Sequence, residues 1–392
     1  MSLGATKKLY DEDSYLKEFT ALVKSCNKSG DFFKIELNQT AFFPEGGGQL
    51  ADPGFFIVNG KEINVFDVQL EGDKVFHFTR EKILENFEIS GVIDFEERFR
   101  RMQNHTGEHI VSGLINRTFG YNNIGFHLGD DDTTCDYDGV LSWNQVKEIE
   151  KAANEAVFAN KKVVAYYPDP VTLPSLEYRS KLDLTEGVRL VMIDGVDCCA
   201  CCAPHVKTTA EVGLIKIVNI EKSHGGTRLH LRCGMSALLD YDEKQTQALR
   251  IGDLLSARQF ELADCVEALQ KANSRLNYEL ARMSEKVAEA TLTSLEKVDG
   301  NKVMVLSNAD TDALRAFANG GRKKVSGLFV ALTEAGTGFR YMITSADDSI
   351  KLSAKAKEFN DALLGRGGGK DDMIQGAFAA PLEEIEKYFD DK

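Results

Sequence analysis

The order in which strand-like and helix-like periodicity follow each other constrains the fold of this chain most. Residues 34–42 and 55–70 alternate apolar and polar side chains, with glycines between them, which is typical of half-buried strands. From Asp94 the apolar residues recur at helical spacing, over residues 95–119. Because helices and strands come in blocks and do not alternate regularly, the sequence predicts an α+β fold.

The rest of the chain extends this pattern and predicts four domains. Residues 142–159 are expected to form a second helix with Ser142 as its N-cap, and strands return at 188–193 and 212–220. The last hundred residues mix strand-like and helix-like segments, as in a small α/β domain. The predicted domains are a β-rich, barrel-like subdomain at 1–92, an α+β core at 93–235, a helical linker at 236–297 and a small α/β domain at 298–392.

The helical linker carries a seven-residue repeat. Its two series are Leu255, Leu262, Leu269, Leu276 and Met283, and, offset by four, Val266, Asn273, Leu280 and Val287. Such a seam is typical of a coiled coil, in which an asparagine at one core position can set the register. The same pattern also fits an amphipathic hairpin that packs on its own chain. The first reading predicts a homodimer through residues 236–297.

Charge and cysteine usage restrict the partners and the compartment. The net charge of −14 does not suit a general nucleic-acid binder, so any such contact must come from local basic patches. Four of the eight cysteines fall between Cys198 and Cys202, which makes a poor disulfide framework and indicates a reduced metal site. No apolar run approaches the length of a membrane span. We therefore expect a cytoplasmic protein without membrane contact.

Two pairs of side chains have the spacing of metal ligands. His105 and His109 are four residues apart, so they share one face of the predicted helix. Cys201 and His205 repeat this spacing further along the chain. Three imidazoles and one thiolate would complete a tetrahedral zinc site.

The local pattern leaves two questions open. The first is which side chain near Cys201 is the ligand, since others compete with it: Asp197, Cys198, Cys199 and Cys202. The second is the chemistry, because H-x-x-E-H at 105–109 also fits a zinc peptidase with Glu108 as general base. A peptidase needs a carboxylate as its third ligand, whereas cysteine and histidine are expected here. Glu108 is then expected in solvent or behind the ligands.

A glycine-rich loop, TAFFPEGGGQLADPG at 40–54, precedes the predicted long helix. Three consecutive glycines, Gly46, Gly47 and Gly48, permit positive φ and close approach of a ligand to the backbone. Their N–H groups could meet a carboxylate, a phosphate or a ribose. A bare glycine run is usually a flexible hairpin tip, but Gln49 adds a polar group at a fixed turn and favours a binding loop.

Together these motifs resemble those of a known family. TAFFPEGGGQLADPG, HTGEHI, CCAPHVKTTAEVG and TRLHLRCGMSAL occur in the same order as in the editing domain of alanyl-tRNA synthetase and in its free-standing relatives, the AlaX proteins. This resemblance covers about residues 5–240. The helical linker and the end near GRGGGKDDMIQGAF are similar to the C-terminal part of that synthetase. The chain is most similar to the long AlaX type, which edits in trans.

The resemblance implies a hydrolase that acts on mischarged tRNA(Ala), with Ser-tRNA(Ala) as the main and Gly-tRNA(Ala) as the second candidate substrate. By position it implies zinc ligands at His105, His109, Cys201 and His205. The residues it places near the substrate are Gln49 and Thr40 for catalysis, and Gly46, Gly47, Gly48, Arg98, Arg101 and Arg189 for binding. A pocket in which Thr40 hydrogen-bonds the seryl hydroxyl would leave polar groups unpaired with alanine and so reject it.

Two further parts of the sequence qualify this reading. The family's C-G-G-T-H reads C-C-A-P-H here, and Pro204 lacks both the hydroxyl and the N–H of the threonine it replaces. The alternative is therefore a non-catalytic, zinc-containing tRNA-binding protein. In the C-terminal domain, Arg366 and Lys370 flank a glycine run and are expected to contact the tRNA backbone. Residues 320–324 are a second basic stretch, unless they form a solvated glycine-rich turn.

Overall fold

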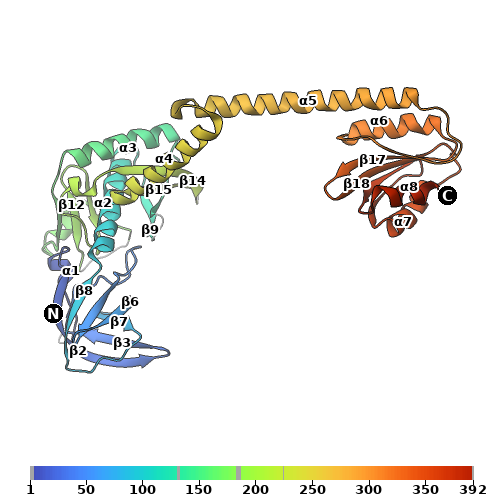
Figure 1. Ribbon diagram of the computed structural model, residues 1–392. Coiled ribbons are helices and arrows are strands. Elements are labelled where there is room, and N and C mark those ends of the chain that lie inside the picture. Colours follow the sequence, from blue (N-terminus) through green and yellow to red (C-terminus); the bar gives the residue numbers. More distant parts are fainter. Residues whose placement is uncertain (1–3, 130–132, 182–186, 224, 391–392) are drawn as a thin grey trace. The chain divides into compact units, whose positions relative to one another are not determined.

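The computed structural model describes residues 4–129, 133–181, 187–223 and 225–390. The chain divides into two compact units, residues 1–247 and 248–392, each with its own core (Figure 1). The finer division into four domains stays a prediction. Within the described ranges, no helix is both long enough and apolar enough to cross a membrane.

A closed β-barrel forms the N-terminal part of the first unit, as the sequence predicted (blue in Figure 1). Its strands, in order around the barrel, are β2 (Glu18–Ser29), β3 (Phe32–Leu37), β7 (Lys74–Thr79), β6 (Lys61–Glu71), β5 (Gly54–Val58) and β8 (Glu88–Ile93). The alternating apolar side chains point inward and form one cluster around Phe42 and Phe56. A short helix, α1 (Leu9–Glu12), and a parallel pair, β1 (Lys7–Lys8) and β4 (Gln39–Thr40), lie beside it.

The long helix α2 (Phe95–Phe119) follows the barrel and passes through the core of the unit. It begins at Asp94, whose side chain accepts a hydrogen bond of 3.1 Å from the backbone N–H of Glu97, and it ends at Gly120 with φ of 73°. The sequence predicted that one apolar face of this helix would be buried. The buried surface is wider, because every residue from Arg101 to Ile115 is buried. Polar side chains on this stretch must therefore meet protein groups or a ligand.

Two antiparallel sheets and a helix surround α2. One sheet has the order β14 (Ile215–Ser223), β15 (Gly226–Cys233), β10 (Thr133–Tyr137) and β9 (Asn123–Leu128), and the other has the order β11 (Val163–Tyr166), β12 (Leu190–Ile193) and β13 (Asp197–Ala200). Helix α3 (Trp143–Phe158) begins after the predicted N-cap, Ser142, which forms a capping box with Gln145. Short 3₁₀ turns lie at Leu173–Ser175 and Thr209–Val212.

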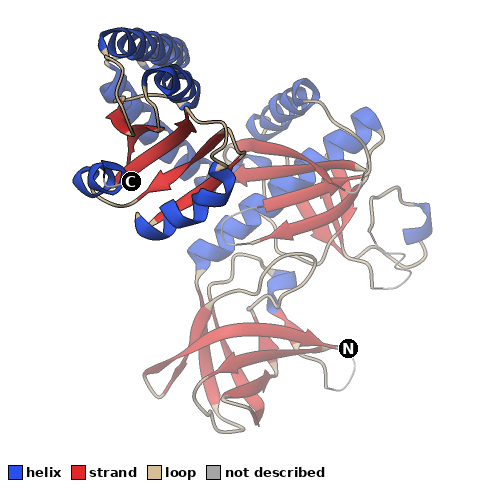
Figure 2. Ribbon diagram, turned by 90° about the vertical axis from the view of Figure 1, so that its right-hand side faces the viewer, coloured by secondary structure: helices blue, strands red, loops and turns tan. Residues whose placement is uncertain are grey.

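The second unit is built on a five-stranded sheet. Its strand order is β16 (Lys302–Val305), β17 (Leu328–Ala335), β18 (Gly338–Ser345), β20 (Met373–Phe378) and β19 (Gly365–Gly369). The helices α6 (Thr311–Gly321) and α5 (Leu262–Ser294) pack on one face, and α7 (Leu352–Ala362) and α8 (Leu382–Asp390) on the other (Figure 2). Only β16 and β17 pair in parallel, so the predicted small α/β domain has a mainly antiparallel sheet.

The glycine run 365–369 is an edge strand of this sheet. Gly367 shows the reason, because a Cβ there would collide with the carbonyl oxygen of Gln375 on the neighbouring strand. Glycines here let β19 and β20 approach closely.

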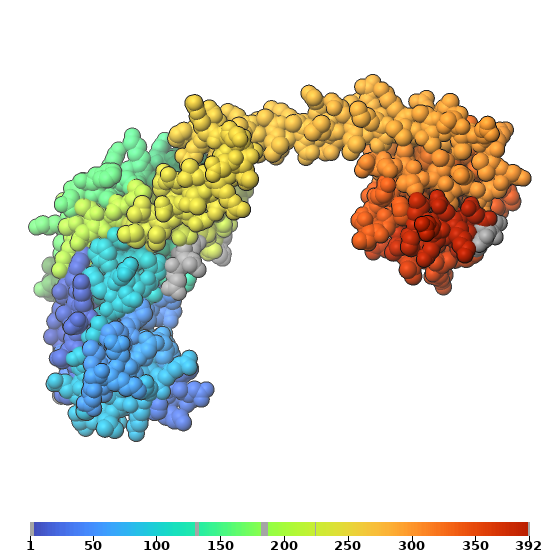
Figure 3. Space-filling model, in the orientation of Figure 1, coloured from blue at the N-terminus to red at the C-terminus, as the bar shows by residue number. Residues whose placement is uncertain are grey.

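The predicted heptad region is divided between two helices. Leu255 ends α4 (Met235–Leu255), and Ser256, with φ of 49°, interrupts the helix before the 3₁₀ turn Gln259–Glu261 and α5. Near its C-terminal end, α5 packs against the rest of its unit through Ser284 and Ala288. Most apolar residues of the heptad series are exposed on α5: Val266, Leu269, Leu276, Leu280, Met283 and Val287. In Figure 3, the first part of α5 has no other segment packed on the face in view. Coiled coil and homodimer remain predictions.

Candidate metal centre and its cavity

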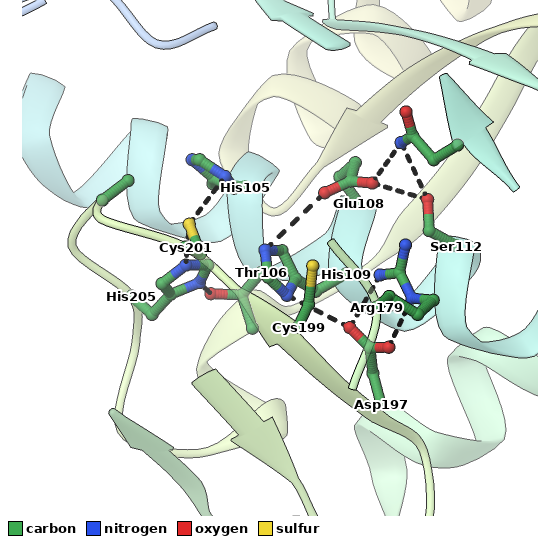
Figure 4. A network of polar contacts seen from close by, with 12 residues as sticks. His105, Thr106, Glu108, His109, Ser112, Arg179, Asp197, Cys199, Cys201 and His205 are labelled. Atoms are coloured by element: carbon green, nitrogen blue, oxygen red, sulfur yellow. Dashed lines mark hydrogen bonds and ion pairs between the residues drawn. The ribbon is translucent and has the colours of Figure 1, made fainter. Parts of the chain in front are cut away.

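Helix α2 and the segment after β13 bring four side chains to one point (Figure 4). His105 and His109 project from α2, and Cys201 and His205 come from the turn that follows β13. One ligand atom from each lies within 4.8 Å of the other three. The Sγ atom of Cys201 is 3.5 Å from Nε2 of His105 and 3.3 Å from Nε2 of His205. This four-residue cluster could hold a metal ion.

The electrostatics of the cluster favour a bound cation. Burial alone would raise the pKa of the Cys201 thiol, but His105 and His205 lower it well below its ordinary value. Burial lowers the pKa of His205 to about 3, so this imidazole is neutral. Burial also acts to lower the pKa of His109, yet hydrogen bonds to Asp197 and Cys201 raise it well above the usual range. A thiolate and neutral imidazoles are the forms that bind metals, so a metal ion would have to displace the proton that His109 holds.

Each imidazole of the cluster has a polar neighbour at its other ring nitrogen. Measured from Nδ1 to the nearest side-chain oxygen of the neighbour, the pairs are His105–Gln49 at 2.8 Å, His205–Thr106 at 3.0 Å and His109–Asp197 at 3.2 Å. Metal-binding histidines generally have such neighbours, which fix the orientation of the ring. The arrangement leaves the three Nε2 atoms for a shared ion.

Asp197, one of the competitors of Cys201, stands behind the cluster. Its two carboxylate oxygens accept hydrogen bonds of 2.7 and 2.8 Å from Arg179. Burial would raise the pKa of Asp197, but the hydrogen bonds from Arg179 and His109 lower it to about 2. Its ligand atom also lies close to those of His109 and Cys199, but burial raises the pKa of the Cys199 thiol to about 11. The thiol of Cys201 is the acidic one of the two.

Glu108 is buried, which excludes the solvent-exposed position considered for it. Its Oε1 atom accepts hydrogen bonds of 2.5 Å from Ser112 Oγ and 2.6 Å from Asn123 Nδ2. Its Oε2 atom lies 3.8 Å from Nε2 of His109 (Figure 4). Burial would raise the pKa of Glu108, but His109, Arg179 and further positive charges lower it. The carboxylate is therefore charged and close to the cluster.

A cavity of about 510 Å³ opens beside the cluster. His105, His109 and Cys201 form part of its wall, together with Glu108. Positively charged and aromatic residues form other parts: Lys8, Arg179, Lys181, Arg189, Phe126 and Tyr167. Such a cavity has the size of a small-molecule site, and its lysines and arginines suit an anionic ligand.

The glycine loop forms a tight turn at this cavity. Gly46 and Gln49 exchange backbone hydrogen bonds of 3.0 Å, and the carbonyl of Gly48 accepts one of 2.7 Å from the N–H of Leu128. Gly47 and Gly48 have φ of 61° and 83°, and a Cβ on Gly48 would collide with Phe126. Gly47 and Gly48 line the cavity. The loop is thus anchored on both sides and is no free hairpin tip.

Gln49 and Thr40 do not line the cavity in the described part of the chain. Gln49 is buried, and its amide reaches the cavity wall through His105. Thr40 lies inside the barrel, where its hydroxyl is 2.8 Å from Nε2 of His77 and accepts a hydrogen bond from the N–H of Phe42. The expected contact of Thr40 with a seryl hydroxyl is therefore not formed by this arrangement.

Three arginines that the resemblance placed near the substrate have protein partners. Arg98 is fully buried and forms an ion pair with Asp52, and Arg101 binds Glu97 and the carbonyl of Ala51. Both lie outside the cavity wall, because their guanidinium groups join α2 to the loop 40–54. Arg189 does line the cavity, and it also donates hydrogen bonds of 3.1 and 2.8 Å to the carbonyls of Cys201 and Ala203.

Of the two candidates in the second unit, Arg366 lies at a separate hollow. Arg366 and Arg340 line a cavity of about 350 Å³ on the sheet, next to Gln375 of β20. Lys370 is exposed just after β19 and is not part of that lining. No motif pointed to Arg340, because it lies in a strand far along the chain from the glycine run.

The barrel core predicts a pH dependence of stability through His77. Burial lowers the pKa of His77 to about 4, whereas an unfolded histidine titrates near 6.5. The contribution of His77 to the free energy of unfolding should be fully present above about pH 6.5 and decrease as the pH drops toward 4, because only the unfolded state then gains the proton. Between about pH 7.5 and about pH 4.5 the loss from this residue is roughly 2–3 kcal/mol.

Urea unfolding of the wild type and of His77→Gln at both pH values measures this contribution. The difference in unfolding free energy between the two proteins should change by that amount between the two pH values, because the contributions of all other titrating groups cancel in the difference. A difference that stays constant with pH would show that His77 does not titrate in this range.

Residues 188–230 match the family described as the threonyl and alanyl tRNA synthetase second additional domain. This segment contains Cys201 and His205, so half of the four-residue cluster lies in it. It begins at Val188 and Arg189, which line the cavity.

Over nearly its whole length the chain is similar to two kinds of protein. It is 29% identical to the alanyl-tRNA editing protein AlaX-L of Pyrococcus horikoshii, over 97% of this chain and 96% of that protein. It is 30% identical to the alanine–tRNA ligase of Pyrococcus abyssi and 31% identical to that of Hyperthermus butylicus, over 95% and 94% of this chain. The chain spans 42% of the length of each ligase.

Part of the chain is also similar to solved structures. Among them is the crystal structure of the C-Ala domain from Aquifex aeolicus alanyl-tRNA synthetase, with 22% identity and a TM-score of 0.20 over 23% of this chain and 87% of that one.

Proposed function

Because this chain resembles an alanyl-tRNA editing protein over nearly its whole length, we propose that it is a hydrolase that cleaves the aminoacyl ester of mischarged tRNA(Ala). Ser-tRNA(Ala) is the main substrate and Gly-tRNA(Ala) the second, while Ala-tRNA(Ala) is spared. The observation that carries the proposal is the contact between the glycine loop and the metal cluster. Gln49 of the loop meets His105 of the cluster at 2.8 Å, beside a cavity with positive charges in its wall.

The metal of this proposal is zinc, which the donor set and its spacing support. In a tetrahedral site with Zn–S of about 2.3 Å and Zn–N of about 2.0–2.1 Å, sulfur and nitrogen ligands lie about 3.6 Å apart. The two distances from Cys201 Sγ to imidazole Nε2 atoms, 3.5 and 3.3 Å, are close to this value. When bound, zinc would fix the four side chains and supply positive charge at the cavity wall.

The residues of the chain would bind and orient the substrate. Lys8 and Lys181 lie where they could meet phosphates of the tRNA 3′ end, and the ring of Phe126 could stack on its terminal base. Gly47 and Gly48 allow the ester to approach the backbone of the loop. An aminoacyl ester is already activated, so holding it beside a positioned water supplies much of the rate. The four-protein-ligand set favours an orienting role of zinc over activation of the water.

A peptidase is the weaker candidate. It needs a carboxylate as a third metal ligand, and the carboxylate of Asp197, which lies beside His109, is held by Arg179. Cys201 and His205 fill the corresponding part of the cluster.

Deacylation assays with four charged tRNAs test the proposed function. The zinc-loaded protein should hydrolyse Ser-tRNA(Ala), and more slowly Gly-tRNA(Ala), but should leave Ala-tRNA(Ala) and Ser-tRNA(Ser) intact. Zinc-loaded protein that hydrolyses none of them, yet binds tRNA(Ala), would establish instead a non-catalytic relative, for which C-C-A-P-H would be the first explanation. Cleavage of unstructured peptides would support the peptidase.

Replacing Gln49 with alanine should lower deacylation while zinc stays bound. The amide holds His105 from behind, and loss of such a neighbour typically costs roughly 10- to 100-fold in metal affinity or activity. Rates at saturating zinc, together with zinc content, separate the two effects. Gln39→Ala is the matched control, because Gln39 donates to the carbonyl of Thr20 on the outside of the barrel and should leave both unchanged. An active Gln49→Ala variant would remove Gln49 from the proposed machinery.

The second unit and α5 enter the proposal as the parts that contact tRNA and a second copy of the chain. Arg366 and Lys370 would bind the tRNA backbone, with Arg340 beside Arg366 in the same hollow. The exposed apolar series on α5 supports a homodimer through residues 236–297.

A further inference from the structure

The cavity beside the metal cluster has a wall that is rich in positive charge. Among the described residues that line it are two lysines and two arginines, and Glu108 is the one carboxylate among them. Asp197 lies close by, but Arg179 takes both of its oxygens and it is not part of the wall. Within the described lining, a cationic group that enters the cavity therefore finds a carboxylate at one place.

The geometry of Glu108 leaves one of its oxygens for such a group. Hydrogen bonds of 2.5 and 2.6 Å from Ser112 and Asn123 hold Oε1 and fix the carboxylate on α2. The other oxygen, Oε2, accepts no hydrogen bond from the described residues and lies 3.8 Å from Nε2 of His109 (Figure 4). A buried carboxylate is costly unless positive groups surround it. Here, the protein hydrogen-bonds one oxygen, while the other lies beside His109 of the metal cluster in a residue that lines the cavity.

The substrate of the proposed function carries a positive charge next to the bond that breaks. The α-ammonium group of an aminoacyl ester is attached to the carbon beside the ester carbonyl. Arg179 and Arg189 are paired with Asp197 and Asp11, so the uncompensated positive charge of the wall comes from Lys8 and Lys181. These lysines attract the tRNA phosphates but repel this ammonium group. A carboxylate beside the metal cluster reverses that repulsion at one point, and charge-assisted hydrogen bonds to it are directional.

We propose that Oε2 of Glu108 binds the α-ammonium group of the aminoacyl ester and so orients the ester carbonyl in the cavity. The inference rests on the proposed function and names the part of the substrate that Glu108 recognises. Glu108 is then a substrate-binding residue, which distinguishes it from a general base that would act on water. This role also explains why a buried carboxylate lies on α2 between His105 and His109.

Two esters and two proteins test this inference. Ser-tRNA(Ala) is compared with the glyceroyl ester of the same tRNA, obtained by nitrous-acid deamination, in which a hydroxyl replaces the α-ammonium group and the acyl group is that of glyceric acid. Both are assayed with the zinc-loaded wild type and with Glu108→Gln. The amide introduced by this substitution would keep an oxygen for Ser112 and Asn123, and zinc content and urea unfolding show whether the variant is intact. The uncatalysed hydrolysis of both esters gives their intrinsic difference in reactivity.

The wild type should prefer the seryl ester in kcat/KM by about 10- to 100-fold beyond the intrinsic difference, as expected for a hydrogen bond to a charged group. Glu108→Gln should lose this preference and hydrolyse the glyceroyl ester about as fast as the wild type does. If Glu108→Gln slows both esters equally, Glu108 acts on a group that both share, such as the water, and the inference is wrong while the function stands. If the wild type hydrolyses neither ester, the proposed function and the inference fall together.

Discussion

Cys201→Ala is expected to empty the metal centre and abolish measurable deacylation of Ser-tRNA(Ala). The thiolate is the anionic ligand of the four, and its loss leaves three neutral imidazoles around a divalent ion. Zinc content should fall from about one ion per chain to near zero, and the deacylation rate by on the order of 10²-fold or more, since even residues behind a ligand cost 10- to 100-fold. Metal analysis after dialysis and single-turnover deacylation measure both quantities.

Cys198→Ala is the matched control for this variant. Cys198 lies three residues earlier, in β13; it packs against the cluster of Leu173, Val188 and Leu190 and is not among the described residues that line the cavity. It should retain zinc and activity. Loss of zinc in Cys198→Ala together with retention of zinc in Cys201→Ala would show that Cys198, and not Cys201, is the metal ligand. Full activity of metal-free Cys201→Ala would show that the cluster is not needed for the reaction.

Asp52→Ala is expected to lower the free energy of unfolding of the first unit by about 3–5 kcal/mol, because it leaves a buried guanidinium group without its partner. Arg98 and Asp52 are both fully buried, and Nε of Arg98 donates to Oδ1 of Asp52 at 2.8 Å. The carboxylate also accepts a hydrogen bond of 2.6 Å from the backbone N–H of Phe43. Urea unfolding at saturating zinc, followed by circular dichroism, measures the loss.

Two further variants make this prediction specific. Arg100→Ala removes a partly exposed ion pair with Glu97 on the same helix and should cost less than about 1 kcal/mol. The double variant Asp52→Leu, Arg98→Met removes both charges and should be more stable than Asp52→Ala alone, as found when a buried pair is replaced by apolar groups. A double variant as unstable as the single one would show that lost packing, and not an uncompensated charge, causes the effect.

Local sequence patterns predicted the elements of this chain better than the surroundings of its side chains. The switch from alternating to helical periodicity at Asp94 correctly placed the barrel before α2, and Ser142 correctly marked the start of α3. The spacing of His105 and His109 depends only on the helix, so it could be read directly. Whether Cys201 and His205 meet them depends on a turn nearly a hundred residues away, which the matching spacing of the two pairs suggested and the resemblance supported.

The residues that were misplaced depend on contacts between distant segments. Arg98 and Thr40 are polar, and nothing in their neighbourhood along the chain indicates that Asp52 and His77 would bury them. Arg179 and Lys181 were missed for the same reason, since they reach the cavity from a segment without any motif. Composition could not assign the glycine run 365–369, because glycine allows both a turn and a closely packed strand, and only the neighbouring β20 decides between them.

The loop that carries Gln49 is closed at its base, and this limits how the protein can change. Asp52 and Phe43 are joined by the backbone hydrogen bond from Asp52 N–H to Phe43 C=O at 3.0 Å, and the carboxylate of Asp52 also anchors Arg98 of α2. Residues 44–51 are therefore held at two places: at the hydrogen bond between Phe43 and Asp52, and at the contact of Gln49 with His105. One residue more or fewer would move Gln49 off the histidine, whereas the open turn at Gly30 has room for insertions. Among homologues, the length of this loop should vary less than its sequence.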